Sequence, residues 1–186
     1  MTPHRSQWSK ERRKFKMEMK DFIKGALDRA KQGTTRAVDG LSHNELIWRP
    51  GPECNSIGLI LFHQTRFEDS FVQGRIVGKP QVWESDKWYE KLNMPASESG
   101  SGYTAEQLAA FRVPELKDLL GYADAVRAKI LEYLKSAPNN EFDRVINMPR
   151  FGDVAVGALL TLVIVHQAQH AGEIAYLRGI QRGMNK

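Results

Sequence analysis

The sequence predicts an all-α protein: a bundle of four main helices with a long loop between the second and the third. Apolar residues recur at spacings of three and four along several stretches, which is the period of a helix with one buried face. The chain has neither an internal repeat nor the alternating pattern of half-buried strands. At 186 residues, 41% of them hydrophobic, it has the length and apolar content of a single domain spanning residues 1–186.

The first main helix is expected over residues 10–32, where the composition favours helix and apolar side chains recur on one side. Met19 and Phe22 belong to that side and are expected to face the core. Gly33 is the expected C-cap, because glycine adopts the left-handed conformation that ends many helices.

Residues 34–47 form a second predicted helical stretch, interrupted at Gly40. After the break, Ser42 and Glu45 have the S-x-x-E spacing of a capping box, in which each side chain bonds the backbone of the other residue. His43 then falls at an exposed position in the first turn, where we expect it to be inert.

The second main helix is expected over residues 57–77, between Asn55 or Ser56 as its cap and the stop Gly-Lys-Pro at 78–80. Its inward stripe brings a histidine to a core face: Ile60, His63, Phe67 and Phe71. Residues 80–104 are rich in proline, glycine and serine, which predicts a long loop. Four aromatic residues indicate that this loop packs over something: Trp83, Trp88, Tyr89 and Tyr103.

A short helix is expected from residue 104 to 111, and the third main helix follows to residue 135, with Pro114 in its first turn. Residues 141–151 have the composition of short extended structure. Asp153 is the expected cap of the last helix, which ends near Gly179 or Gly183.

The last helix carries two histidines four residues apart in an otherwise apolar stretch. Its inward stripe contains three polar groups among apolar ones: Leu159, Val163, His166, His170, Glu173 and Leu177. One buried histidine needs only a hydrogen bond, whereas two stacked ones need a shared partner, and a metal ion is the usual one.

Side chains four apart on a helix lie close enough for His166 and His170 to bind one ion, and His63 can supply a third ligand from another helix. Three imidazoles leave coordination positions open, as in catalytic sites, and suit zinc, nickel, iron or copper. The site is not a zincin, because Gln167 stands where that motif has its glutamate. The inward glutamates of a di-iron bundle are absent from the sequence pattern.

Of three further charged residues, Glu173 and Arg178 have two interpretations each and Glu68 has one. Glu173 can orient a histidine or act as a general base, or it can simply bond tyrosine or arginine inside the bundle. Glu68 lies well around the helix from His63 and is expected to bond a neighbouring helix. Arg178 complements a helix C-terminus or holds an anion at the mouth of the pocket.

The net charge of +5 is concentrated in the first twenty residues, where seven cationic side chains stand against two acidic ones: Arg5, Lys10, Arg12, Arg13, Lys14, Lys16 and Lys20 against Glu11 and Glu18. Such a segment can touch nucleic acid, but a solvated helix face is the simpler interpretation, so no nucleic-acid partner is expected. The single Cys54 fits a reducing compartment. The longest apolar run, 154–165, is too short for a membrane span, and no secretory signal is visible, so a cytoplasmic protein is expected.

Two segments together resemble the DinB/YfiT-like superfamily of metal-dependent enzymes: LIWRPGPECNSIGLILFHQTRFE at residues 46–68 and HQAQHAGEIAYLRG at residues 166–179. The resemblance covers essentially the whole chain. It implies an up-down-down-up four-helix bundle with one divalent metal, usually nickel or zinc, at positions matching His63, His166 and His170. Members with a known activity are transferases, isomerases and hydrolases that use a low-molecular-weight thiol such as bacillithiol or mycothiol.

Two functional hypotheses from different classes follow. In the first, the chain is a metal-dependent enzyme for a small-molecule substrate that enters past the 80–104 loop, with Trp83 and Trp88 in a lid over the pocket mouth. A homodimer interface built from the same aromatic residues is the alternative use of that loop. In the second hypothesis, the protein is a non-catalytic, stress-related scaffold whose histidines hold a metal for stability or hold none.

Overall fold

The structure is a computed structural model and describes residues 17–149 and 151–183. It is mostly helical, which confirms the all-α class, with a small two-stranded sheet among the described residues. The elements, in chain order, are α2 (Met19–Val38), α3 (His43–Ile47), α4 (Ile57–Asp69), the π-helix η2 (Ser70–Val77), α5 (Val82–Ser85), α6 (Trp88–Lys91), α7 (Ala105–Ala110), α8 (Leu116–Ser136), the 3-10 turn η3 (Glu141–Asp143), β1 (Val145–Met148), β2 (Gly152–Ala155) and α9 (Val156–Arg182).

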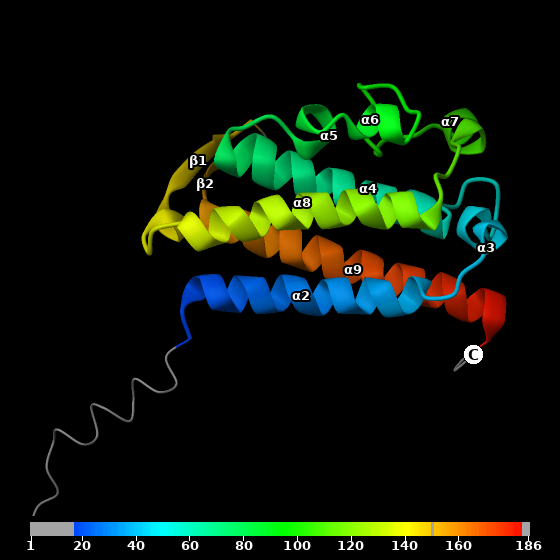
Figure 1. The fold of residues 1–186 in the computed structure, drawn as a ribbon, viewed down its shortest axis with the longest axis horizontal. Helices are drawn as coiled ribbons and strands as arrows, with labels where there is room; N and C mark the ends of the chain where they lie inside the picture. The colour runs from blue at the N-terminus through cyan, green and yellow to red at the C-terminus, as the bar shows by residue number, and fades with distance from the viewer. Residues whose placement is uncertain (1–16, 150, 184–186) are drawn as a thin grey trace, which may run out of the picture.

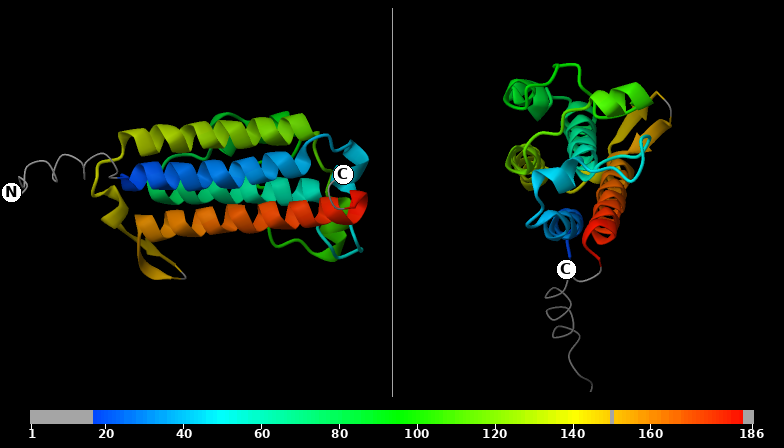
Figure 2. Two further views of the ribbon diagram at one scale, coloured as in Figure 1. Left: turned by 90° about the horizontal axis from the view of Figure 1, so that it is seen from below. Right: turned by 90° about the vertical axis from the view of Figure 1, so that its right-hand side faces the viewer.

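Four long helices of the described chain, α2, α4, α8 and α9, lie side by side (Figures 1 and 2). In the view of Figure 1, α2 and α9 run from left to right, whereas α4 and α8 run from right to left. The helix α2 packs against α9, and α4 packs against both α8 and α9. Each helix contributes fully buried side chains to the shared core, among them Leu27, Phe62, Val126, Ile130, Val163 and Ile174.

The first helix differs from its prediction in both extent and buried face. Within the described chain it begins at Met19, and it continues through Gly33 to Val38. Met19 and Phe22, expected in the core, are exposed, and the buried stripe is shifted by one residue: Ile23, Leu27, Ala30, Thr34, Ala37 and Val38. Burial of the last turn of α2 against α9 keeps Gly33 helical, because tertiary packing overrides the weak preference of one glycine. The helix ends at Val38, and the chain turns through Asp39 and Gly40, where φ of Gly40 is +67°.

Other local predictions have mixed outcomes. Ser42 and Glu45 form the expected capping box at the start of α3, and the second main helix spans the expected range as α4 and η2. Asp153 does not cap α9, because it lies in β2, which pairs antiparallel with β1, and it accepts a hydrogen bond from Asn147 Nδ2 at 2.7 Å. Ala155 occupies the N-cap position of α9 without a side-chain bond.

The 80–104 segment contains the short helices α5 and α6 and is attached to the core at its beginning. The carboxylate of the buried Asp69 accepts the backbone N–H groups of Val82 and Trp83, each at 2.9 Å, and the hydroxyl of Tyr122 at 2.7 Å. Trp83 is fully buried and donates its indole N–H to Ala96 O at 2.9 Å. The expectation that Trp83 lies in a lid over a pocket mouth is therefore wrong, because its ring belongs to the hydrophobic core.

Among the described residues, no helix is both long enough and apolar enough to cross a membrane. Most of the basic segment of residues 1–20, and with it the start expected for the first helix at residue 10, lies outside the described part of the chain.

Candidate metal centre

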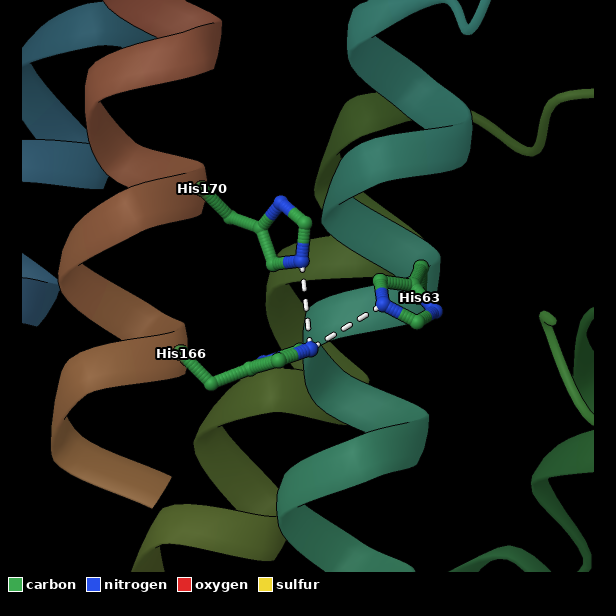
Figure 3. A group of neighbouring side chains, drawn as sticks. All are labelled: His63, His166 and His170. Atoms are coloured by element: carbon green, nitrogen blue, oxygen red, sulfur yellow. Dashed lines mark hydrogen bonds between the residues drawn. The ribbon is translucent and has the colours of Figure 1, made fainter. Parts of the chain in front are cut away.

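Three histidines from two neighbouring helices meet on the seam between α4 and α9. His63 lies in the middle of α4, and His166 and His170 lie one turn apart on α9 (Figure 3). Because α4 packs directly against α9, side chains on facing turns of the two helices come into contact. The fold therefore brings together the three histidines that the sequence analysis singled out.

The three rings converge through their Nε2 atoms. His166 Nε2 lies 3.1 Å from His63 Nε2 and 3.2 Å from His170 Nε2. Tetrahedral ligands at zinc–nitrogen distances of about 2.0–2.1 Å are separated from one another by roughly 3.3 Å. One ligand atom from each histidine lies within 4.8 Å of the others, so the group could hold a metal ion with little movement.

The outer nitrogens of two rings face hydrogen-bond acceptors. His63 Nδ1 lies 2.9 Å from the carbonyl oxygen of Gly100 and 3.0 Å from Ser101 Oγ, and His170 Nδ1 lies 2.6 Å from a carboxylate oxygen of Glu173. Carbonyl and carboxylate oxygens only accept, so these contacts favour the tautomers in which Nδ1 carries the proton. The Nε2 lone pairs of His63 and His170 then both point at His166.

The three facing Nε2 atoms have more lone pairs than protons to share. A neutral His166 can donate its Nε2 proton to one neighbour at most, which leaves the other lone pair facing it without a proton. A cation at the centre would satisfy all three nitrogens together, and an acceptor on the outer nitrogen is the usual support of a metal-binding histidine. The donor set therefore fits a metal ion of the kind that imidazole prefers.

The His166 ring is held by stacking. It lies parallel to Phe67, with ring centroids 3.7 Å apart, and its buried Nδ1 has no hydrogen-bond partner among the described residues. Burial and the nearby His170 and His63 lower the pKa of His166 to about 3. Burial, followed by the charge of His170, also lowers the pKa of His63. Both rings are therefore neutral near pH 7, as metal ligation requires.

The site borders a surface hollow of about 360 Å³. Its walls include His63 and His170, the segment Gly100–Tyr103, and Glu53 and Asn55 from the connection that precedes α4. A small molecule can therefore reach the edges of the His63 and His170 rings from solvent.

The family profile described as the DinB superfamily matches residues 26–174, a range that contains all three histidines and most of the chain. The chain belongs to the DinB superfamily. This confirms the resemblance seen in the two sequence segments.

A solved structure is also similar to this DinB chain, the crystal structure of the conserved protein of locus from Enterococcus faecalis. Its TM-score is 0.78 at 23% sequence identity, and the match covers 89% of this chain and 98% of that one. At this identity the likeness shows a shared fold. A search among curated proteins found no match.

Of the other residues that the sequence analysis raised, Glu173 contacts a member of the triad, while its carboxylate remains half exposed. Glu68 forms a buried ion pair with Arg127 of α8 at 2.8 Å, in agreement with its expected bond to a neighbouring helix. Arg178 donates to three carbonyl oxygens at the end of α2, including Asp39 O at 2.6 Å. It therefore complements the C-terminus of another helix.

His43 is exposed at the start of α3 and lies outside the triad. Its Nδ1 is 3.3 Å from Glu115 Oε1. Cys54 is exposed and is not a member of the three-histidine group.

Three contributors to the site have no role in the sequence analysis: Gly100, Ser101 and the stacking of Phe67 on His166. Gly100 has φ of +73°, and a Cβ on it would lie 3.2 Å from the Phe62 ring and 3.3 Å from His63 Cα. Glycine therefore allows this backbone to approach α4 and place its carbonyl at His63. The serine- and glycine-rich composition of this loop is visible in the sequence. That the loop packs on α4 is not.

Proposed function

We propose that this DinB-superfamily chain is a metal-dependent enzyme in which His63, His166 and His170 bind one divalent ion, zinc or nickel. The single observation that carries this proposal is the convergence of the three histidine Nε2 atoms. In two of these rings, His63 and His170, Nδ1 also lies against a hydrogen-bond acceptor. A divalent ion at this point would lower the pKa of a coordinated thiol from its free value of about 8.5, so that the reactive thiolate is available at neutral pH.

The chain's own residues have distinct roles in this proposal. Glu173 holds a proton on Nδ1 of His170, Gly100 does the same for His63, and both thereby direct the Nε2 lone pairs toward the ion. Glu173 is half exposed, so it can also exchange a proton with solvent or substrate. The reaction proposed is the transfer of a low-molecular-weight thiol to an electrophile, or a related hydrolysis.

We further propose that residues 1–186 form one domain and that the four long helices form an up-down-down-up bundle around the site. The helix directions and neighbours support the bundle, and the coverage of the similar solved structure supports one domain. The loop segment 100–103, which borders the hollow, takes the access role that was expected of the tryptophans.

Metal analysis tests the ligand assignment. Protein purified without a histidine tag should contain about one divalent ion per chain, and the His63→Ala, His166→Ala, His170→Ala triple variant should contain none. Gln169→Ala, an exposed position on the same helix, is the control. Wild-type stoichiometry in the triple variant would place the metal elsewhere.

Turnover assays with several thiols and electrophiles test the chemistry. We expect metal-dependent turnover that His166→Ala abolishes and Cys54→Ser leaves intact. Loss of turnover in Cys54→Ser with metal still bound would mean that the protein's own thiol reacts.

A second candidate function is that of a metal-stabilised scaffold without catalysis. It is favoured by the position of the triad across the α4–α9 seam, where an ion would join two helices. Metal binding that raises stability without turnover for any thiol and electrophile pair would support this alternative.

A further inference from the structure

A small pocket inside the helix bundle, called the inner pocket below, is separate from the histidine site. Its volume is about 30 Å³, and none of the three histidines is among its described walls. Four buried polar side chains from three helices line it: Thr34 of α2, Gln64 and Glu68 of α4, and Arg127 of α8. Each of these four residues is only 3–6% exposed. The pocket is therefore a polar space in the interior of the fold.

Several polar atoms of the inner pocket have no partner within the described part of the chain. One nitrogen of the Arg127 guanidinium, Nη2, lies 2.8 Å from Glu68 Oε1. The other two nitrogens, Nε and Nη1, are buried without a hydrogen bond, and so is Gln64 Oε1. The Thr34 hydroxyl also forms no hydrogen bond with the described residues. Buried donors and acceptors without partners are costly and rare in folded proteins, so these atoms indicate a bound molecule.

The mixture of donors and acceptors selects the kind of molecule. The N–H groups of Arg127 can only donate, whereas Gln64 Oε1 and an ionised Glu68 carboxylate can only accept. An anion would suit Arg127 but would face both acceptors, and a metal cation would face the guanidinium. Water both donates and accepts, and a buried water molecule typically makes about three hydrogen bonds. Water is thus the ligand that matches the walls.

The size of the inner pocket and its access to solvent agree with this choice. A pocket needs roughly 10–15 Å³ to hold one water molecule, so about 30 Å³ has room for one or two. Between α2 and α8 the walls include the exposed residues Lys31 and Asp124, which pair with each other at 2.5 Å. Solvent can therefore enter past a surface ion pair.

We propose that the inner pocket is a binding site for one or two internal water molecules, which hydrogen-bond to Arg127, Gln64 and Thr34. The water joins α8, α4 and α2 in the interior of the bundle. The backbone carbonyl of Gln64 also accepts a hydrogen bond from Gln167 of α9 at 2.8 Å. Through Gln64, the hydrated pocket is thus connected to all four long helices, and displacing the water should destabilise the fold. This inference does not depend on metal binding or on catalysis.

A high-resolution crystal structure of the wild-type protein tests the site directly. We expect density for one or two water molecules within hydrogen-bond distance of Arg127 Nε or Nη1 and of Gln64 Oε1. Soaking a crystal in bromide distinguishes water from an anion, because bromide gives an anomalous signal. A pocket without density in the wild type, or an anomalous bromide peak inside it, would overturn the proposal.

A substitution that fills the pocket tests the role of the water in solution. Ala123→Leu adds a branched apolar side chain to a wall of the pocket. We expect a smaller oxygen-17 relaxation dispersion, which counts long-lived internal water, by the amount of one or two molecules. The Tm should fall by about 3–6 °C, because Arg127 and Gln64 lose their partner. Ala128→Leu, at an exposed position of α8 that does not line the pocket, is the matched control and should change neither quantity.

The direction of the Tm change separates a hydrated pocket from a dry one. Filling a dry space adds van der Waals contacts, so a higher Tm in Ala123→Leu with an unchanged dispersion would overturn the proposal. An unchanged dispersion in a variant whose crystal structure places the leucine inside the pocket would overturn it as well. If the leucine turns toward solvent or the variant does not fold, the wild-type density and the bromide soak decide the question by themselves.

Discussion

At the contact between α4 and α9, adjacent residues of each helix have different roles. His63 and His166 belong to the group that could hold a metal ion, while the next residues, Gln64 and Gln167, are buried. Gln167 donates its Nε2 hydrogen to Gln64 O at 2.8 Å, which ties the two helices directly behind the triad. Gln167 is therefore a structural contact at the position where a zincin would have its catalytic glutamate.

The role of Glu173 can be tested by two substitutions. Glu173→Ala removes the acceptor on His170 Nδ1 and should weaken metal binding about 10–100-fold, the usual effect of losing such a support. Glu173→Gln keeps an oxygen acceptor and should retain most of the affinity. Competition with a chelating dye measures both.

Wild-type affinity in Glu173→Ala would contradict the orienting role. If Glu173→Gln binds metal normally but has lost turnover, the charged carboxylate itself takes part in proton transfer.

The ion pair of Glu68 with Arg127 is buried in the bundle, so breaking it should be costly. Arg127→Met leaves the carboxylate of Glu68 without its cation and should reduce the free energy of unfolding by about 3–5 kcal/mol near neutral pH. Lys129→Met removes an exposed ion pair from the same helix and should change it by less than about 0.5 kcal/mol. Urea denaturation measures both variants.

The loss in Arg127→Met should depend on pH. Burial raises the pKa of Glu68, so the folded state keeps this proton at pH values where the unfolded chain has lost it. Acidification toward the ordinary range of a glutamate therefore stabilises the fold through this group, and removal of Arg127 strengthens the effect. The deficit should be smaller at pH 5.5 than at pH 8, and equal deficits would contradict this account.

At the scale of elements, the end of the 80–104 segment contacts His63 of α4, a proposed metal ligand. Gly100 and Gly102 have nearly the same φ, +73° and +72°, but a Cβ on Gly102 would meet nothing within 4 Å. Alanine at either position has the same left-handed strain of about 1–2 kcal/mol. A difference in metal affinity between the two variants therefore reports the contact of Gly100 with α4.

We expect Gly100→Ala to weaken metal binding about tenfold relative to Gly102→Ala. The added methyl group pushes the loop away from Phe62 and His63, and the carbonyl contact at His63 Nδ1 is lost with it. Isothermal titration with zinc compares the two. If both variants bind equally well, the Gly100 carbonyl does not support the site.

At the scale of the whole molecule, a bound ion would join α4 to α9 across the seam. Binding to the folded state alone adds about 2.7 kcal/mol at a metal concentration one hundred times the Kd, which is a rise in Tm of roughly 5–10 °C for a chain of this size. Zinc or nickel should produce this shift in the wild type and not in the triple-histidine variant. Magnesium is the control, because it prefers oxygen ligands. The same shift in the triple variant would contradict this location of the ion.

The all-α class and the candidate metal ligands could be read from the sequence, because both depend on helical periodicity. The spacing of His166 and His170 places them on one face of any helix, and the stripe containing His63 follows from the same period. The capping box at Ser42 is also a local pattern, since its two partners lie three residues apart.

Only the tertiary structure decided which groups share a partner across the fold. The contacts of Gly100 with His63 and of Arg127 with Glu68 join residues 37 and 59 positions apart, and periodicity carries no information about such pairs. The extent of α2 and its buried face also depend on packing against α9, where burial of several side chains outweighs one glycine. Helix period sets the direction of each side chain, whereas the partner it meets is set by how the helices and loops pack.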